Sequence, residues 1–323
     1  MVNEKGKNMA VKVFIDGSEG TTGLRIYERF EGRDDVELLK IDPELRKDPE
    51  ERKKMINSSD ITFLCLPDVA AIESAELVSN DHTVIIDTST AHRTSDGWVY
   101  GFPELNKGNR QVIKESKRIA VPGCYATGFI TLAHPLIASG IMPEDYPVAS
   151  FAVSGYSGAG KKTIAVYEGE DKPLEFNSPR EYALPQQHKH LKEMKKIAGL
   201  SRTPLFSPII ADYYSGMFVS IPLYTDMLNG HPSPEAIRDM YAKFYEGEKF
   251  IKVMEFGAEA ETNGFLGANN CSGWDGLQVF VTGNEDRVVV SSRFDNLGKG
   301  ASGAAIQCMN IVLGCDEAKG LNL

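Results

Sequence analysis

The sequence has little of what proteins need to bind nucleic acid or to cross a membrane. Its 323 residues carry 35 Lys and Arg against 45 Asp and Glu, a formal charge of −10. Nucleic acid and anionic membranes attract clustered cations, so neither is an expected partner. No stretch approaches the ~18 consecutive apolar residues of a membrane helix, and the N-terminal MVNEKGKNMA lacks the apolar core of a signal peptide. We therefore expect a cytoplasmic protein that binds a small molecule.

The cysteines lack any recognisable pairing. The five of them form no CxxC motif and show no Cys/His spacing of a metal site. Their odd number in a long chain indicates reduced thiols, which fits the cytoplasm. The sequence predicts neither disulfides nor a metal centre.

The chain is longer than one typical domain of about 100–200 residues, and 42% of it is apolar, enough for two cores. Short apolar runs at 11–16, 36–42, 61–66, 83–87 and 118–121 alternate with helical patterns, which predicts a parallel sheet. After residue 125 the pattern changes to longer strands at 148–153, 205–213, 217–224, 277–282 and 288–294, with helices at 126–139, 234–247 and 301–313. We expect a second, α+β domain, in which a hairpin joins the last two strands.

A glycine turn, GSEGTTG at 17–23, lies between the first predicted strand and the first helix. Gly17, Gly20 and Gly23 form a GxxGxxG variant of the dinucleotide-binding fingerprint, whose N–H groups can receive a pyrophosphate. The expected packing face of the helix comprises Gly23, Ile26, Tyr27 and Phe30. The alternative is a glycine turn without a ligand.

The group expected at the adenosine ribose is Asp42, at the end of the second strand. A carboxylate there favours the ribose hydroxyls of NAD. However, three cations follow closely and could hold the 2′-phosphate of NADP, namely Arg46, Lys47 and Arg52. These residues leave the phosphorylation state of the cofactor open.

A second glycine-rich segment, GYSGAGKKT at 155–163, nearly matches a P-loop. Lys162 stands where a P-loop needs a Ser or Thr hydroxyl for Mg²⁺, which disfavours phosphotransfer from a nucleotide. The segment could still cradle a substrate phosphate or carboxylate with its N–H groups, Ser154, Ser157 and its two lysines. The alternative is a flexible glycine loop.

Cys124 follows a Pro-Gly turn in VPGCYAT and opens a helix. A helix N-terminus lowers the pKa of a thiol, so Cys124 is a candidate nucleophile. Cys65, Cys308 and Cys315 are expected to be small hydrophobic residues.

A proton carrier is expected in QHKHLKEM at 187–194. In a helix, His190 would share an inward face with Leu191, Met194 and Ile197, whereas His188 would point outward. Glu193 could orient a neighbouring group. The alternative for His190 is a hydrogen-bonded core histidine.

Taken together, six motifs resemble those of N-acetyl-gamma-glutamyl-phosphate reductase, type 2 branch. They are GSEGTTG, DTSTAHR at 87–93, VPGCYAT, SGYSGAG at 154–160, HKHLKE at 188–193 and DNLGKGASGAAIQ at 295–307. The resemblance implies the fold group of aspartate-semialdehyde and glyceraldehyde-3-phosphate dehydrogenases. In that α/β fold, a Rossmann-like NADP-binding domain would span 1–123 plus 300–323, and an α+β catalytic and oligomerisation domain would span 124–299.

By this resemblance, Cys124 is the catalytic cysteine and His190 the acid and base. The turn that holds the NADP pyrophosphate would comprise Gly17, Ser18, Gly20, Thr21, Thr22 and Gly23.

The resemblance implies roles for five further residues. Ser157 and Gly158 would lie near substrate and nicotinamide, and Asn296 and Lys299 in a late loop that returns toward the cofactor. Arg93 stands where the type 1 pattern SADFR has an arginine, and would face the acyl phosphate. Ser154, from the glycine-rich segment that could cradle an anion, is a further candidate for substrate contact.

The implied reaction is the NADPH-dependent reduction of N-acetyl-L-glutamyl 5-phosphate to N-acetyl-L-glutamate 5-semialdehyde, with release of inorganic phosphate, in arginine biosynthesis. The resemblance also implies a homo-oligomer, either dimer or tetramer. Three alternatives stay open: an aspartate- or aminoadipate-semialdehyde dehydrogenase of the same fold, a P-loop phosphotransferase, and a cofactor-binding sensor without catalysis.

Overall fold

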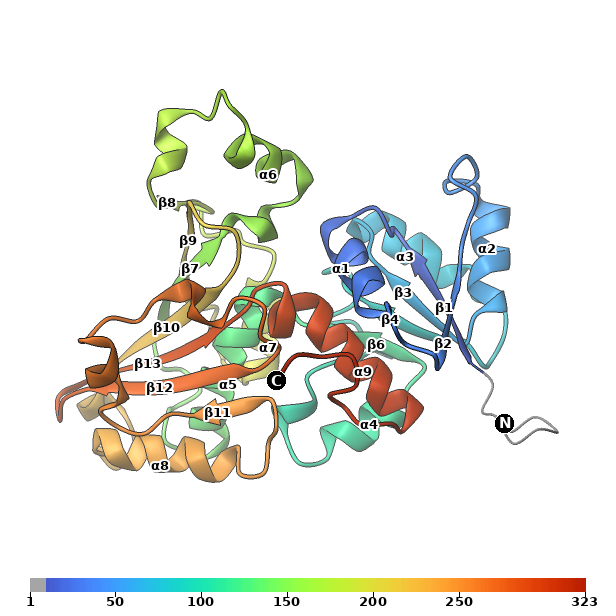
Figure 1. Cartoon of the computed structure of the whole chain (residues 1–323). Coiled ribbons are helices and arrows are strands. Elements are labelled where there is room, and N and C mark those ends of the chain that lie inside the picture. The colour runs from blue at the N-terminus through green and yellow to red at the C-terminus, as the bar shows by residue number, and fades with distance from the viewer. Residues whose placement is uncertain (1–9) are drawn as a thin grey trace. The chain divides into compact units, whose positions relative to one another are not determined.

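The computed structural model describes residues 10–323, except for the side chain of Glu261, and divides into two compact units (Figure 1). The first comprises the described residues up to Pro103, Gly108–Pro122 and Ser302–Leu321, and the second comprises Glu104–Lys107, Gly123–Ala301 and Asn322–Leu323. Residues 1–9, which the predicted first domain includes, lie outside the described residues. The predicted boundaries missed that 104–107 and the last two residues belong with the second unit.

The first unit contains a six-stranded sheet in the order β2-β1-β3-β4-β6-β5, in which every pairing is parallel. Its strands are β1 (Val11–Asp16), β2 (Val36–Leu39), β3 (Ile61–Leu64), β4 (Val84–Asp87), β5 (Val99–Tyr100) and β6 (Arg118–Ala120). The predicted parallel sheet is confirmed. β2 is shorter than expected, so Asp42 lies three residues beyond its end.

Helices cover both faces of this sheet (Figure 1). One core contains α1 (Thr21–Arg29), α4 (Asn109–Glu115) and α9 (Gly303–Leu313), and the other contains α2 (Pro49–Ser58) and α3 (Asp68–Glu76). Because side chains alternate along a strand, Val13 and Ile15 of β1 enter the first core and Phe14 enters the second. Tyr27 was wrongly expected on the buried face of α1, since it is 37% exposed.

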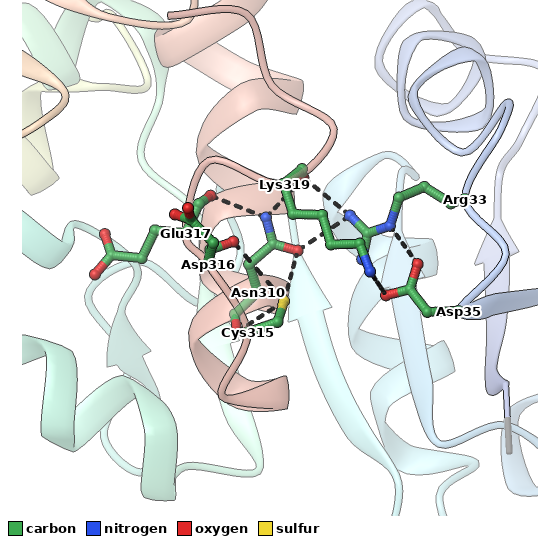
Figure 2. Close-up of polar contacts among 7 residues, drawn as sticks. All are labelled: Arg33, Asp35, Asn310, Cys315, Asp316, Glu317 and Lys319. Atoms are coloured by element: carbon green, nitrogen blue, oxygen red, sulfur yellow. Dashed lines mark hydrogen bonds and ion pairs between the residues drawn. The ribbon is translucent and has the colours of Figure 1, made fainter. Parts of the chain in front are cut away.

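The segment after α9 is fastened to the connection between α1 and β2 (Figure 2). Arg33 donates hydrogen bonds from Nη1 to the Asn310 side-chain oxygen at 3.2 Å and to the Lys319 carbonyl at 2.9 Å. Asp35 pairs with Arg33 at 2.7 Å and with the Lys319 ammonium at 2.9 Å. Cys315, expected on the last helix, lies just beyond it with its thiol near the oxygens of Asn310.

The second unit contains a seven-stranded mixed sheet in the order β11-β12-β13-β10-β7-β9-β8. Its strands are β7 (Ala149–Gly155), β8 (Arg180–Glu181), β9 (Leu205–Ala211), β10 (Met217–Tyr224), β11 (Ile251–Val253), β12 (Leu277–Gly283) and β13 (Arg287–Phe294). The predicted hairpin is confirmed, because β12 and β13 pair antiparallel along their whole length.

Two helices, α5 (Cys124–Ala138) and α8 (Pro234–Phe244), pack on one face of this sheet, and α7 (Leu191–Ala198) packs against α5. Gly128 lets α5 approach closely, since a Cβ there would lie 2.6 Å from the Val219 side chain on β10. Tyr241 donates from its hydroxyl to the Leu132 carbonyl at 2.6 Å, which fixes α8 to α5. A smaller helix, α6 (Lys161–Glu168), follows β7. Among the described residues, no helix has the length and apolar character that spanning a membrane requires.

Candidate active site

Cys124 is the first residue of α5 and its thiol is half-buried. Gly123 is the N-cap, no side chain caps this end of the helix, and the first turn contains no acidic residue. The thiol therefore faces the positive end of a fifteen-residue helix, which favours a thiolate. Gly300 packs closely beside it, because a Cβ at that position would lie 3.0 Å from the Cys124 Cβ.

His190 lies at the N-cap of α7, rather than inside a helix as expected, and is only 5% exposed. Its backbone N–H donates to Nδ1 of His188 at 3.1 Å, and the two imidazole rings lie 4.6 Å apart. His188 was wrongly expected to point outward. Its ring contacts those of Tyr125 at 5.6 Å and Phe206 at 5.2 Å, because the chain turns into α7 here and helical periodicity does not apply.

The segment that begins at His190 contacts both neighbours of Cys124. Glu193 is buried, and its Oε2 accepts a hydrogen bond at 3.2 Å from the N–H of Gly123, the residue before Cys124. On the other side, the ring of Tyr125 lies 6.0 Å from that of His190. The structure thus brings the segment of Cys124 and the segment of His190 together within the second unit.

The surroundings of Cys124 are aromatic. Burial raises the pKa of Tyr125 and of Tyr182 well above the usual value of a phenol. Both hydroxyls therefore stay neutral across the physiological range and can donate hydrogen bonds without competing for the proton of His190.

The segment that nearly matches a P-loop does not form an anion cradle with its first N–H groups. β7 ends at Gly155, a 3₁₀ turn covers Tyr156–Ala159, and α6 follows. Three N–H groups expected to be available already donate to carbonyls, from Gly155 to Gly216 and from Tyr156 and Ser157 to Tyr213 and Tyr214, at 2.9–3.0 Å. These three N–H groups are therefore not available to an anion, because they bond to a neighbouring loop, and an anion role for the rest of the segment stays a prediction.

Three of the predicted cofactor residues come together in the second unit. Asn296 donates from its amide to the Ser157 hydroxyl at 2.9 Å and accepts from the Gly216 N–H at 2.9 Å. A Cβ on Gly158 would lie 3.3 Å from the same amide nitrogen. Ser154, the predicted substrate contact, donates to the Gly155 carbonyl at 3.0 Å. The network shapes this loop, and the binding roles of these residues stay predictions.

Lys299, predicted in a late loop that returns toward the cofactor, is buried and paired with a carboxylate. It lies in a π-helical turn, Gly298–Ser302, is fully buried, and places its ammonium 2.8 Å from both carboxylate oxygens of Glu104. Its charge is thereby balanced inside the second unit. No sequence pattern marked Glu104, since its partner lies 195 residues away.

The first unit has a cavity of about 500 Å³ at the glycine turn. Gly17, Ser18 and Gly20 line it, whereas Thr21, Thr22 and Gly23 follow in the first turn of α1. Gly17 has a φ of +88°, and a Cβ there would lie 2.4 Å from the Cys65 carbonyl oxygen. The N-terminus of α1 has no side-chain cap and no acidic residue in its first turn, which suits an anion.

Two residues proposed to contact the ribose already have other partners, and only Arg52 of the two lines this cavity. Asp42 is exposed and accepts a hydrogen bond from the N–H of Glu44, so its carboxylate closes a turn. Arg52 is buried and pairs with the Asp16 carboxylate at 3.0 Å, so its charge is already balanced.

Arg93, the predicted contact of the acyl phosphate, lies in the first unit and is 8% exposed. Its guanidinium donates to the carbonyls of Val121 at 2.8 Å and Thr88 at 3.0 Å, which ties the segments after β6 and β4 together. A substrate role for Arg93 stays a prediction.

The comparisons with known proteins agree with this architecture. The model of the semialdehyde dehydrogenase NAD-binding domain matches residues 7–115, and that of the semialdehyde dehydrogenase dimerisation domain matches residues 124–296. In overall fold, the structure resembles aspartate semialdehyde dehydrogenase II of Vibrio cholerae in complex with ASA, with a TM-score of 0.70 and 16% identity over 95% of this chain and 99% of that one.

Curated relatives are much closer in sequence. N-acetyl-gamma-glutamyl-phosphate reductase 2 of a Nostoc species is 47% identical over 96% of this chain and 99% of the relative. The enzyme of the same name from Pseudomonas putida is 42% identical over 95% of this chain and 98% of the relative. Such identity over nearly the full length of both chains shows that this protein belongs to the N-acetyl-gamma-glutamyl-phosphate reductase family.

Proposed function

We propose that this protein catalyses the NADPH-dependent reduction of N-acetyl-L-glutamyl 5-phosphate to N-acetyl-L-glutamate 5-semialdehyde and inorganic phosphate, a step of arginine biosynthesis. The observation that carries the proposal is the placement of Cys124 at the start of α5, where Glu193 contacts Gly123 and His190 contacts Tyr125. The family membership supports the same reaction.

The first half of the reaction needs a nucleophile. The Cys124 thiolate attacks the carbonyl carbon of the acyl phosphate, the C–S bond forms, and the C–O bond to phosphate breaks. The helix N-terminus stabilises the thiolate before the attack. The product is a thioester on Cys124 and free inorganic phosphate.

The second half needs a hydride and a proton. NADPH, when bound, supplies the hydride that reduces the thioester carbon. His190 donates a proton to the oxyanion that results, then removes the hydroxyl proton as the C–S bond breaks and the aldehyde leaves. The residues predicted for the cofactor are the glycine turn of the first unit and the segment of Ser157, Gly158, Asn296 and Lys299 in the second.

Two variants test these roles. Cys124→Ser should abolish phosphate-dependent reduction of NADP by N-acetyl-L-glutamate 5-semialdehyde, and a near-normal rate would refute the thioester route. His190→Asn should slow turnover while NADPH binding, followed by cofactor fluorescence, stays normal. Loss of both together would make His190 a structural residue.

The same chemistry would serve aspartyl or aminoadipyl phosphate, so the acyl group is tested directly. Rates with the acetylglutamate, aspartate and aminoadipate semialdehydes should favour the first. A higher kcat/KM with either of the others would reassign the substrate.

We further infer a homodimer built on the sheet face opposite α5. Phe218 neighbours Val219 on β10, so its side chain points to this opposite face, where its ring contacts that of Phe151 at 6.2 Å. Phe151 is 38% exposed and Leu205, on the neighbouring strand, is 63% exposed. An apolar sheet face of this kind suits a second copy, and the match to a dimerisation domain supports it. A cytoplasmic location fits the five free thiols.

A further inference from the structure

The charged side chains of the first unit bear on the selection of NADP(H) over NAD(H). This inference rests on the cofactor use proposed above. The two cofactors differ only by a phosphate on the 2′ oxygen of the adenosine ribose. A protein that selects NADP(H) therefore needs cations at the ribose, whereas one that selects NAD(H) places a carboxylate there. The question is which charged side chains of this unit face the ribose.

The fold determines where the parts of a bound dinucleotide lie in the cavity at the glycine turn. In such sheets the pyrophosphate lies at the turn between the first strand and helix, and the ribose lies beyond the end of the second strand. Gly17 and Ser18 of the glycine turn line this cavity, and so do Pro43, Arg46 and Lys47, which follow β2. Leu66 and Pro67, after β3, add an apolar wall that suits an adenine ring.

Two of the charged residues in this region already have hydrogen-bond or ion-pair partners within the protein. Asp42, which would read the ribose hydroxyls of NAD(H), does not line the cavity and instead accepts a hydrogen bond from the Glu44 N–H at 2.9 Å. Arg52 lines the cavity but is bound by the buried carboxylate of Asp16 and by Ser74. Neither is set to recognise a phosphate.

Arg46 and Lys47 have a different setting. Both line the cavity beyond β2, and the guanidinium of Arg46 pairs with the carboxylate of Glu19, which lies in the glycine turn and lines the same cavity. Both side chains of this pair are substantially exposed, at 46% and 64%, so the pair is weak and can be exchanged. A guanidinium binds a phosphate with the same two-pronged geometry that it uses for a carboxylate.

We propose that Arg46 and Lys47 recognise the 2′-phosphate of NADP(H), and that Glu19 is the counter-ion of Arg46 until this phosphate replaces it. Asp42 does not line the cavity, which leaves room for the phosphate of NADP(H), and the two cations select this cofactor. Glu19 keeps the guanidinium beside the glycine turn, where the rest of the cofactor binds.

The test measures the affinities of NADPH and NADH separately, by cofactor fluorescence, for the full-length protein and its variants. Arg46→Met and Lys47→Met should each weaken NADPH binding by about 10- to 100-fold, the range for a lost hydrogen bond to a charged group, and leave NADH binding almost unchanged. Adenosine 2′,5′-bisphosphate should compete with NADPH in the wild type and lose this ability in the same variants. The matched control is Lys40→Met, an exposed lysine that lines a neighbouring cavity of about 260 Å³, and it should retain the preference for NADPH.

A fourth variant isolates Glu19. Glu19→Gln frees Arg46, so NADPH affinity should rise up to about five-fold at low salt, while NADH affinity stays constant. An unchanged or lower NADPH affinity overturns the role of Glu19.

The outcomes distinguish this inference from the proposed function. If the wild type binds NADH as tightly as NADPH, the proposed cofactor is wrong. If the wild type prefers NADPH but Arg46→Met and Lys47→Met keep that preference, or weaken both cofactors equally, the recognition by Arg46 and Lys47 is refuted. Loss of the preference in Lys40→Met alone would move the site to the neighbouring cavity and equally refute it.

Discussion

Glu193 accepts a hydrogen bond from the backbone N–H of Gly123, and so joins the helix after His190 to the residue before Cys124. The carboxylate is 2% exposed, which makes the contact sensitive to replacement. Its position three residues after His190 lets one helix place the segments of both predicted catalytic residues, Cys124 and His190.

Replacing Glu193 should therefore affect turnover. Glu193→Ala leaves the buried N–H of Gly123 without its acceptor, at a cost of about 1–3 kcal/mol. The resulting shift of Cys124 should lower kcat by up to about 100-fold, since a displacement of 1 Å can have this effect. Glu193→Gln keeps an acceptor oxygen and should recover most of the rate.

The readouts are kcat, the rate of Cys124 alkylation by iodoacetamide, and NADPH affinity. A positioning role predicts that the first two fall in Glu193→Ala while the third stays constant. Equal loss of all three in both variants would instead indicate general unfolding.

The buried pair of Lys299 and Glu104 should stabilise the fold mainly because each side chain neutralises the buried charge of the other. Lys299→Met leaves a buried carboxylate without its cation and should lower the free energy of unfolding by about 3–5 kcal/mol. The double variant Lys299→Met/Glu104→Leu should recover most of this loss, because apolar pairs often replace buried ion pairs at little cost.

The control is Lys172, which pairs with Asp212 at 2.7 Å in a partly exposed position. Lys172→Met should cost about 1 kcal/mol or less. Denaturant unfolding of the four proteins gives the comparison, and a Lys299→Met loss no larger than that of Lys172→Met would contradict it.

The proposed dimer can be tested on the sheet face that α5 does not cover. Phe151→Glu puts a charge onto this face, which should convert the dimer into a monomer in analytical ultracentrifugation. Leu174→Glu is the matched control, because Leu174 is 83% exposed and lies outside this sheet. A dimer that persists in Phe151→Glu, or dissociates only in Leu174→Glu, would rule out this face.

Acid should weaken the attachment of the C-terminal segment. Hydrogen bonding to Arg33, with a smaller contribution from Lys319, lowers the pKa of Asp35 to about 2 (Figure 2). Since the folded pKa lies below the unfolded one, near 3.8, the stabilisation is complete above pH 4 and is lost as the pH falls toward 2. Solvent reaches this pair, so the expected loss is about 1 kcal/mol.

The measurement is the free energy of unfolding between pH 5 and pH 2 for the wild type and Asp35→Asn. The difference between the two should shrink as the pH falls through this window, because Asp35 becomes protonated and loses its charge, whereas the other carboxylates titrate alike in both proteins and cancel. A constant difference would show that Asp35 does not contribute through its charge.

Much of the first unit could be predicted because its signals are local. The alternation of apolar runs with helical patterns identified five of its six strands, and the glycine turn was located between β1 and α1. The exception, β5, has only two residues and leaves no periodic pattern. Likewise, Cys124 could be predicted to lie at a helix N-terminus because a strand, a Pro-Gly turn and the start of a helix follow one another directly in the sequence.

What the sequence by itself determined is therefore most of the longer strands of both sheets, the turn that suits a pyrophosphate and the cysteine at a helix N-terminus. Only the tertiary structure decided which side chains meet: Lys299 with Glu104, Glu193 with Gly123, and Arg46 with Glu19. The physical reason is that periodicity and turn chemistry act over a few residues, whereas the partner of a charge depends on which segments packing brings together.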